Sequence, residues 1–357
     1  MLKERDYANI LKYLKDHLFD RNKYNEIISI CEFWNRAVND NTAIIYFFLG
    51  IAYNGVKDFY SSIQSHKKAL QLDPTLADIK YKQDLYKGIY DEYRTACIGC
   101  GSNEYDIVNV TNQSITEVNL GIINPLRIWV QCKDCGLIFA NPIPSKKSMD
   151  TYYSLITKER REGGRYTNVD NMLEFLIKMS NYRLEKIEHI RNGRGSLLDI
   201  GTGVGVFVGV ALERGWRAEG LELTQEDCKY AKENFGISLR NRDFYALGEG
   251  EDYDVITLFE VIEHLRTPLK DLKQINRLVK DNGLLVIATP IVDSLHGKKA
   301  RETSGYWNVV THLSYFSKSV LMNYLEKAGF ETIEVNYSPE GIGRMEFYCK
   351  KVKNVEY

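Results

Sequence analysis

The stretch Leu197-Leu-Asp-Ile-Gly-Thr-Gly-Val-Gly205 decides the fold of a large part of this chain. Apolar residues lead into Asp199, and glycines then stand at positions 201, 203 and 205. The next residues carry apolar side chains at helical spacing and end at Gly215. We therefore predict a buried strand, a tight glycine turn and a helix that begins beside a ligand. Free N–H groups and the helix dipole at such an N-terminus favour an anionic group.

The spacing of the glycines distinguishes between two kinds of nucleotide site. A dinucleotide-binding turn needs Gly-x-Gly-x-x-Gly, but valine holds the third glycine position in both possible registers, at Val206 or Val208. The next predicted strand, Arg217-Ala-Glu-Gly-Leu-Glu222, ends in an acid that could accept hydrogen bonds from a ribose diol. Asp-x-Gly-x-Gly-x-Gly followed by such an acid resembles the S-adenosylmethionine (SAM) site of class I methyltransferases. An ordinary strand–turn–helix unit with incidental glycines is the alternative.

From Ser196 onward, strand-like and helical segments alternate, which predicts an open α/β sheet that is mostly parallel. We expect seven strands, near residues 196–200, 217–222, 237–240, 254–259, 283–289, 331–336 and 344–350. We expect helices near residues 204–214, 226–234, 268–280 and 318–328. The last two strands, joined around Gly341 without a helix, predict a hairpin with one antiparallel strand. The resemblance implies the same fold, a seven-stranded, Rossmann-like class I methyltransferase sheet.

Ligands of such sheets bind beyond the carboxyl ends of the strands, and the resemblance implies roles for residues there. Asp199 would hold the ammonium of SAM, Glu222 would bind the ribose hydroxyls, and Leu223 would pack on the adenine. Asp243 would accept a hydrogen bond from the adenine amino group, with an ordinary turn acid as the alternative. The expected cofactor site comprises Asp199, Gly201, Thr202, Gly203, Gly205, Glu222, Leu223, Asp243, Phe244, Phe259 and Glu260.

Titratable groups are concentrated in the segment Asp254-Val-Ile-Thr-Leu-Phe-Glu-Val-Ile-Glu-His264. The strand delivers Glu260, Glu263 and His264 at its carboxyl end. We expect His264 to act as the general base beside Glu263, because an imidazole pKa of about 6.5 suits proton transfer at neutral pH. One alternative is a helix-start histidine that is bonded to the backbone. Another is a Mg²⁺ or Mn²⁺ site, since the Glu-x-x-Glu-His arrangement resembles that of ubiquinone-pathway O-methyltransferases.

Residues 289–317 lie between the fifth strand and the last helix and show no clear periodicity. Long loops in compact domains are usually functional, so we expect this segment to form a wall of the substrate site. It contains Thr311-His-Leu-Ser-Tyr-Phe316, which resembles the family's His-Leu-x-x-Phe signature. His312 is therefore a second candidate base, and the alternative is a buried histidine that anchors the loop.

Two Cys-x-x-Cys-Gly motifs, which begin at Cys97 and Cys132, are separated by a segment of strand-like sequence. Each motif makes a tight turn that directs two sulfurs to one point, and the glycine relieves the turn. Two such turns form the tetrahedral sulfur site of a zinc ribbon. We predict a structural zinc, because four thiolates leave no open position for chemistry, and four free cysteines are the alternative. The expected ligands are Cys97, Cys100, Cys132 and Cys135.

The second motif continues as Cys135-Gly-Leu-Ile-Phe-Ala-Asn-Pro142, and Tyr152-Tyr153 follows before the glycine turn. This combination resembles the zinc-ribbon class I methyltransferases that are often linked to sugar and surface-glycan biosynthesis, including a group like the deoxysugar C-methyltransferases. The resemblance covers roughly residues 96–350. Within it, the charged stretch Lys158–Asn168 predicts a loop or linker, and Asp170–Arg191 predicts an amphipathic helix that leads to the sheet.

Residues 1–95 predict an all-helical region. Part of it matches the tetratricopeptide spacing, at Tyr46, Leu49, Gly50, Tyr53, Ala69 and Pro74. The small Gly50 and Ala69 would let two helices approach closely. We also expect flanking helices at Asp6–His17, Tyr24–Val38 and Leu76–Tyr93. Such helix pairs often bind a protein partner, although a helical domain packed on its own enzyme is an equal alternative.

The composition limits the choice of partners and location. Lysine and arginine number 47 against 48 acids, so the net charge of −1 gives no basic field for nucleic acid. The first residues lack a secretory apolar core, and no run reaches the ~20 apolar residues of a membrane helix. We expect a soluble cytoplasmic protein with a helical domain (1–95), a zinc ribbon (96–145), a linker and helical cap (146–195) and a SAM-binding domain (196–357).

The predicted function is SAM-dependent methyl transfer to oxygen or carbon of a small metabolite, with a sugar nucleotide or glycan precursor as the preferred acceptor. Candidate bases are present, whereas none of the cysteines lies where it could serve as a nucleophile. Three alternatives stay open. They are a protein methyltransferase recruited through residues 1–95, an RNA methyltransferase and a non-catalytic adaptor.

Overall fold

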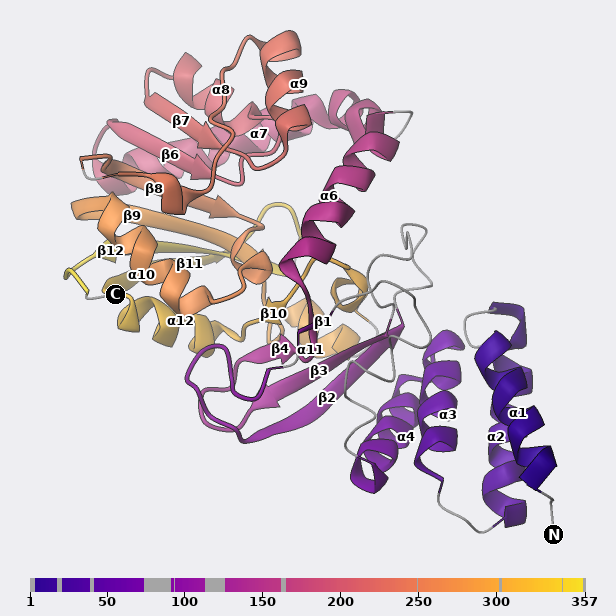
Figure 1. The fold of residues 1–357 in the computed structure, drawn as a ribbon. Helices are drawn as coiled ribbons and strands as arrows, with labels where there is room; N and C mark the ends of the chain where they lie inside the picture. Colours follow the sequence, from indigo (N-terminus) through magenta and orange to yellow (C-terminus); the bar gives the residue numbers. More distant parts are fainter. Residues whose placement is uncertain are drawn as a thin grey trace. The chain divides into compact units, whose positions relative to one another are not determined.

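The computed structural model of the chain is drawn as a ribbon in Figure 1. The chain folds into two compact units. One unit comprises Met1–Tyr152 and Ala300–His312, and the other comprises Tyr153–Lys299 and Leu313–Tyr357. No described helix is long and apolar enough to cross a membrane. The described residues are 4–17, 21–38, 42–73, 91–92, 94–112, 126–161, 165–248, 250–301, 304–341 and 343–355.

Helices open the first unit: α1 (Glu4–His17), η1 (Arg21–Lys23), α2 (Tyr24–Val38), α3 (Ala43–Gly55) and α4 (Phe59–Leu72). α3 and α4 meet at Gly50, where a Cβ atom would lie 2.0 Å from the ring of His66. The hydroxyl of Ser62 donates a hydrogen bond of 2.7 Å to the Gly50 carbonyl. The predicted close approach of two helices at Gly50 is therefore confirmed, and the tetratricopeptide assignment stays a prediction.

Short strands follow in the same unit: β1 (Asp91–Glu92), β2 (Tyr105–Asn112), β3 (Leu126–Cys132), β4 (Ile138–Ala140) and β5 (Ile143–Pro144). β2, β3 and β4 form an antiparallel sheet, and β1 pairs with β5. The expected helix over 76–93 lies mostly outside the described residues, but its end is wrong because Asp91–Glu92 is a strand. The amide of Asn54 in α3 donates to the Val110 carbonyl in β2 at 2.6 Å, so the helices pack on this sheet.

Part of the predicted substrate-wall loop also belongs to the first unit. It contains the short helix η7 (Gly305–Asn308), where the ring of Trp307 packs edge-on against Trp129 of β3 at 5.4 Å. The guanidinium of Arg127, which is 2% exposed, donates to the carbonyls of Val310 and His312. From its position in the sequence, this segment is expected beside the methyltransferase sheet. The hydrogen bonds of the buried Arg127 instead fix it to β3.

Two long helices, α6 (Lys146–Arg161) and α7 (Arg165–Arg191), precede the large sheet. The expected loop at 158–168 is wrong, because residues 158–161 end α6 and residues 165–168 begin α7. The loop was predicted from the charge of this stretch. Lysine, glutamate and arginine have high helix propensity, so a charged stretch can equally form a helix. The expected helix at 170–191 is confirmed and begins five residues earlier.

The second unit contains a six-stranded sheet in the order β11-β12-β9-β8-β6-β7. β6 to β9 are parallel neighbours, while β12 runs antiparallel to β9 and to β11, so the predicted hairpin is confirmed. The strands are β6 (Ser196–Ile200), β7 (Arg217–Leu221), β8 (Tyr253–Phe259), β9 (Val279–Pro290), β11 (Phe330–Tyr337) and β12 (Arg344–Lys351).

The predicted seventh strand at 237–240 is reduced to one parallel bridge between Leu221 and Arg240. Gly236 ends the preceding helix in a left-handed conformation, so only a few residues remain before the turn at Asn241. Arg240 alone reaches the sheet edge, where its N–H donates to the Gly220 carbonyl.

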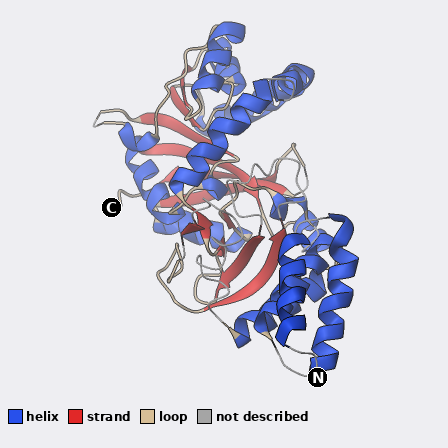
Figure 2. Ribbon diagram, turned by 45° about the vertical axis from the view of Figure 1, so that its right-hand side comes forward, coloured by secondary structure: helices blue, strands red, loops and turns tan. Residues whose placement is uncertain are grey.

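Helices cover both faces of the sheet (Figure 2). α7 packs with α8 (Val206–Glu213), while α10 (Pro268–Leu278) packs with α12 (Lys318–Lys327). The remaining elements are α9 (Gln225–Phe235), η4 (Phe244–Ala246), η5 (Ile262–His264), α11 (Leu295–Ala300) and β10 (Ser314–Tyr315). The expected helices at 204–214, 226–234, 268–280 and 318–328 are all present within two residues.

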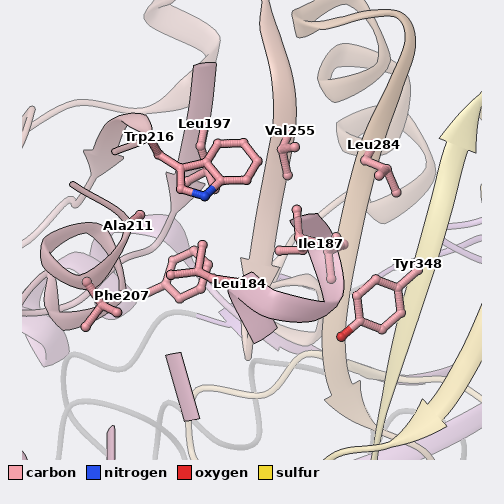
Figure 3. Close-up of a cluster of buried hydrophobic side chains, with 11 residues drawn as sticks. Leu184, Ile187, Leu197, Phe207, Ala211, Trp216, Val255, Leu284 and Tyr348 are labelled. Carbon is pink, nitrogen blue, oxygen red and sulfur yellow. The ribbon is translucent and has the colours of Figure 1, made fainter. Parts of the chain in front are cut away.

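One apolar cluster holds α7 and α8 against the sheet (Figure 3). Leu184 and Ile187 of α7 are fully buried beside strand residues such as Leu197 and Val255. Trp216 closes the cluster and donates its indole N–H to Glu188 at 3.0 Å. Burial of these side chains stabilises the packing of α7 and α8 on the sheet that carries the candidate site.

Leu184→Ala should lower the free energy of unfolding by about 2–5 kcal/mol, because a fully buried leucine leaves a cavity. Denaturant titration of the full chain measures this change. Leu212→Ala in α8 is the matched control, since Leu212 is 46% exposed and its loss should cost much less. Equal effects of the two substitutions would contradict the assignment of Leu184 to the core.

Candidate cofactor site and cysteine cluster

The four predicted cysteine ligands come together in the first unit, with every pair of sulfurs within 4.8 Å. The Sγ atoms of Cys97 and Cys135 are 3.6 Å apart, and those of Cys100 and Cys132 are 3.5 Å apart. Tetrahedral zinc–sulfur bonds of about 2.3 Å require sulfurs about 3.8 Å apart. The donor set and its spacing therefore fit a zinc ion.

The glycines that end the two cysteine motifs have the predicted role. Gly101 and Gly136 have φ angles of +79° and +74°, which favour residues without a side chain. Their N–H groups donate to the carbonyls of Cys97 and Cys132 at 2.9 and 3.0 Å. These bonds close the turns that direct each pair of sulfurs inward.

Purified protein should contain about one zinc per chain by elemental analysis, because four converging thiolates favour this metal. Cys132→Ser should reduce the zinc content and destabilise the first unit, where structural zinc contributes on the order of 10 kcal/mol. Cys349→Ser is the control, since this buried cysteine lies on β12 of the other unit. Full zinc content in Cys132→Ser would contradict the cluster's role as a metal site.

The glycine turn after β6 is fixed by its own backbone N–H groups and leads into the N-terminus of α8. The N–H groups of Gly201 and Thr202 donate to the Leu221 carbonyl at the end of β7, which fixes the turn between two strand ends. Gly205 is left-handed, with φ of +78°, and gives α8 no side-chain cap. The first N–H groups of α8 therefore have no capping side chain, as the predicted anion site requires.

Asp199 and Glu222 stand at the ends of adjacent strands, β6 and β7. Asp199 is 3% exposed, accepts a hydrogen bond of 2.6 Å from the Thr257 hydroxyl, and has its pKa raised to about 6 by burial. The two oxygens of Glu222 accept from the N–H groups of Gly203 and Thr224 at 2.9 and 2.8 Å. A carboxylate oxygen has two acceptor positions, so Glu222 can also accept from a ribose diol.

The predicted adenine residues lie in the loops after β7 and after the Arg240 bridge. Leu223 is 69% exposed, so its side chain is accessible to a flat base. Asp243 accepts a 2.9 Å hydrogen bond from the N–H of Tyr245, and Phe244 is buried beside it. Asn241, which we did not predict, donates to the carbonyls of Glu222 and Leu223 and fixes the loop.

Glu260 follows β8 in a left-handed conformation, with φ of +56°. One of its carboxyl oxygens lies 2.8 Å from Nε of Arg344, and no described residue donates a hydrogen bond to the other. Burial, and then the charge of Glu263, raise the pKa of Glu260 to about 8. The preceding residue, Phe259, packs edge-on against Phe207 at 5.0 Å and is therefore part of the core.

Glu263 and His264 lie in η5, directly after Glu260. Glu263 is fully buried, accepts a 2.9 Å hydrogen bond from the Thr289 hydroxyl, and has its pKa raised to about 7 by burial. His264 is half-buried, and its backbone N–H donates to the Val261 carbonyl. A cation at these acids, the alternative to a general base, would compete with protein groups, because Arg344 and Thr289 each contact one carboxyl oxygen.

His312, the second candidate base, is 5% exposed and belongs to the first unit. Its catalytic role stays a prediction. Three partners of these acids were not predicted from the sequence and come from other strands: Arg344, Thr257 and Thr289. Thr257 gave a signal, since it is the polar residue inside the otherwise apolar stretch from Val255 to Phe259.

One region of the chain matches a known protein family. Residues 172–335 match the model of a family described as a methyltransferase domain. The chain is 25% identical over 196 residues to the ubiquinone biosynthesis O-methyltransferase of Idiomarina loihiensis, covering 51% of this chain and 81% of that one. It is 31% identical over 121 residues to the enzyme of the same name from Actinobacillus pleuropneumoniae serotype 5b, covering 30% of this chain and 51% of that one. The chain thus spans about half the length of that relative.

Among solved structures, the chain resembles Burkholderia thailandensis 1,6-didemethyltoxoflavin-N1-methyltransferase, with a TM-score of 0.46 and 15% identity over 62% of this chain and 98% of that one. The family match, together with the glycine turn and the strand order, shows that this part of the chain is a class I SAM-dependent methyltransferase domain. The expected enzyme class is confirmed.

Glu222→Ala should weaken the binding of SAM and S-adenosylhomocysteine by about 1–3 kcal/mol, because hydrogen bonds to a charged group are lost. Calorimetric titration measures both ligands. Glu219→Ala is the matched control on the same strand, where the side chain is exposed and pairs with Arg240. Unchanged affinity in Glu222→Ala would argue against the ribose assignment.

The buried acids predict a pH dependence of stability. Glu263 has an ordinary pKa of 4.5 and one of about 7 when folded, so the folded chain binds a proton that the unfolded chain releases between these values. Stability should therefore fall as pH rises from 4.5 to 7, by on the order of 3 kcal/mol for a shift of this size. Thermal unfolding as a function of pH measures the slope. Glu263→Gln should flatten this slope, whereas Glu233→Gln on the surface of α9 should preserve it.

Proposed function

We propose that this chain transfers the methyl group of SAM to a hydroxyl oxygen of a small metabolite. The observation that carries the proposal is the position of His264, which follows the half-buried Glu260 and the buried Glu263 at the same sheet edge as Asp199 and Glu222. The relatives named ubiquinone biosynthesis O-methyltransferases support oxygen as the accepting atom. The cysteine motifs and the sequence after them support a sugar nucleotide or glycan precursor as the acceptor, and methylation of carbon is the alternative.

Each group would have a distinct task. SAM supplies a methyl group that is already activated, so the protein has to align the acceptor and remove its proton. His264 would take the hydroxyl proton, because a neutral imidazole is an effective base near pH 7. Asp199 and Glu222 would hold the cofactor. The four cysteines would bind zinc as a structural ion, which leaves no open position for substrate.

His264→Ala should lower the rate of methyl transfer by about 10²–10⁴-fold, the usual contribution of a general base. The assay follows labelled methyl from SAM into a panel of sugar nucleotides, glycan precursors and quinone precursors. SAM affinity, measured by calorimetry, should stay unchanged. His189→Ala is the control, because this exposed histidine lies at the end of α7.

Three outcomes would count against the proposal. Wild-type protein that binds no SAM would refute the cofactor site. Methyl transfer that survives in His264→Ala would remove the role of His264 and favour His312 as the base. Labelling of protein or RNA in place of the small molecules would replace the acceptor class.

A further inference from the structure

Asp271, in the first turn of α10, connects two loops of the methyltransferase domain. It is 4% exposed, and one carboxyl oxygen accepts a 2.7 Å hydrogen bond from the hydroxyl of Tyr245. The other oxygen accepts from the backbone N–H and the hydroxyl of Thr267 at 3.1 and 3.2 Å. Burial raises the pKa of Asp271, while these hydrogen bonds favour its charged form.

The hydrogen bond from Tyr245 connects Asp271 to the loop that carries the predicted adenine contacts. The N–H of Tyr245 donates to Asp243, and its ring lies against Phe244 with centroids 4.7 Å apart. Tyr245 is 42% exposed, so burial alone does not fix its side chain. The hydrogen bond to Asp271 therefore holds the adenine loop against α10.

The hydrogen bonds from Thr267 connect Asp271 to the segment that carries the candidate base His264. Thr267 ends the turn that begins at η5, and its carbonyl accepts a 2.9 Å hydrogen bond from the N–H of Asp271. A capping interaction at the start of α10 accounts for these contacts. It does not account for the bond from Tyr245 to Asp271, because Tyr245 lies in a loop 26 residues earlier in the chain.

We propose that Asp271 is a positioning residue for cofactor binding, which acts on the adenine loop through the hydroxyl of Tyr245. The inference rests on the proposed cofactor site and adds a determinant of affinity that does not itself touch the cofactor. Because the same carboxylate also holds Thr267, it links the adenine loop to the segment that carries His264.

Tyr245→Phe tests the inference, since it removes one hydroxyl from a partly exposed ring and leaves the fold intact. Calorimetric titration of the full chain with S-adenosylhomocysteine should show an affinity about five- to tenfold lower, the scale of one hydrogen bond to a charged group. Adenosine, measured by competition, should lose affinity by the same factor, because the change concerns the adenine loop. A merely structural bond would lower the unfolding temperature and spare the affinity.

Tyr230→Phe is the matched control, because the Tyr230 hydroxyl on the neighbouring helix α9 also bonds an aspartate, Asp170. Its affinity should equal that of the wild type. Asp271→Asn keeps an oxygen that can accept from Tyr245 and should retain most of the affinity, whereas Asp271→Leu should lose as much as Tyr245→Phe. The double variant Tyr245→Phe/Asp271→Leu should lose no more than either single variant if both act through one bond.

The outcomes separate this inference from the proposed function. A wild type that binds neither S-adenosylhomocysteine nor SAM would overturn both. A wild type that binds, together with unchanged affinity in Tyr245→Phe, would overturn the inference alone. A loss for S-adenosylhomocysteine without a loss for adenosine would also overturn it, since the effect would then lie away from the adenine.

Discussion

A Cβ atom at Gly201 would lie 2.6 Å from the side chain of Val261, closer than real Cβ contacts come. Gly201 follows β6 and Val261 follows β8, so a side chain at position 201 would collide with Val261. The N–H groups of the glycine turn are held by the Leu221 carbonyl at the end of β7. Three strand ends therefore meet around one turn, and the acids that follow these strands share one edge of the sheet.

Burial of several carboxyl groups at this edge has to be offset locally. Asp199, Glu260 and Glu263 all have raised pKa values, and burial is the largest cause in each case. Their partners are Thr257, Arg344 and Thr289, which come from β8, β12 and β9. Burying apolar side chains here would cost less free energy than burying these acids with their partners. The network lies at the edge that carries the candidate site, which favours a functional reason for it.

The parts of the site that follow one another in sequence were predictable, and the parts that meet only through the sheet were not. Glycine spacing and the acids at 199 and 222 indicated the cofactor turn because these residues act within one strand–turn–helix unit. Arg344 reaches Glu260 only because β12 inserts antiparallel beside β9, which no local pattern encodes. The seventh strand was predicted wrongly because the segment at 237–240 has the composition of a strand but is too short to form more than one bridge.

The two compact units differ from the linear domains that composition suggested, and Arg127 illustrates the reason. The chain passes between the units three times, at residues 152, 299 and 312. A fragment that ends at residue 152 would keep the cysteine sheet but lose the carbonyls of Val310 and His312, to which the buried guanidinium of Arg127 donates. Each buried donor left without an acceptor costs about 1–3 kcal/mol. The sheet that carries the cysteines is therefore completed by a segment that follows β9 of the large sheet in the sequence. Experiments on partners of the helical region belong on the full chain.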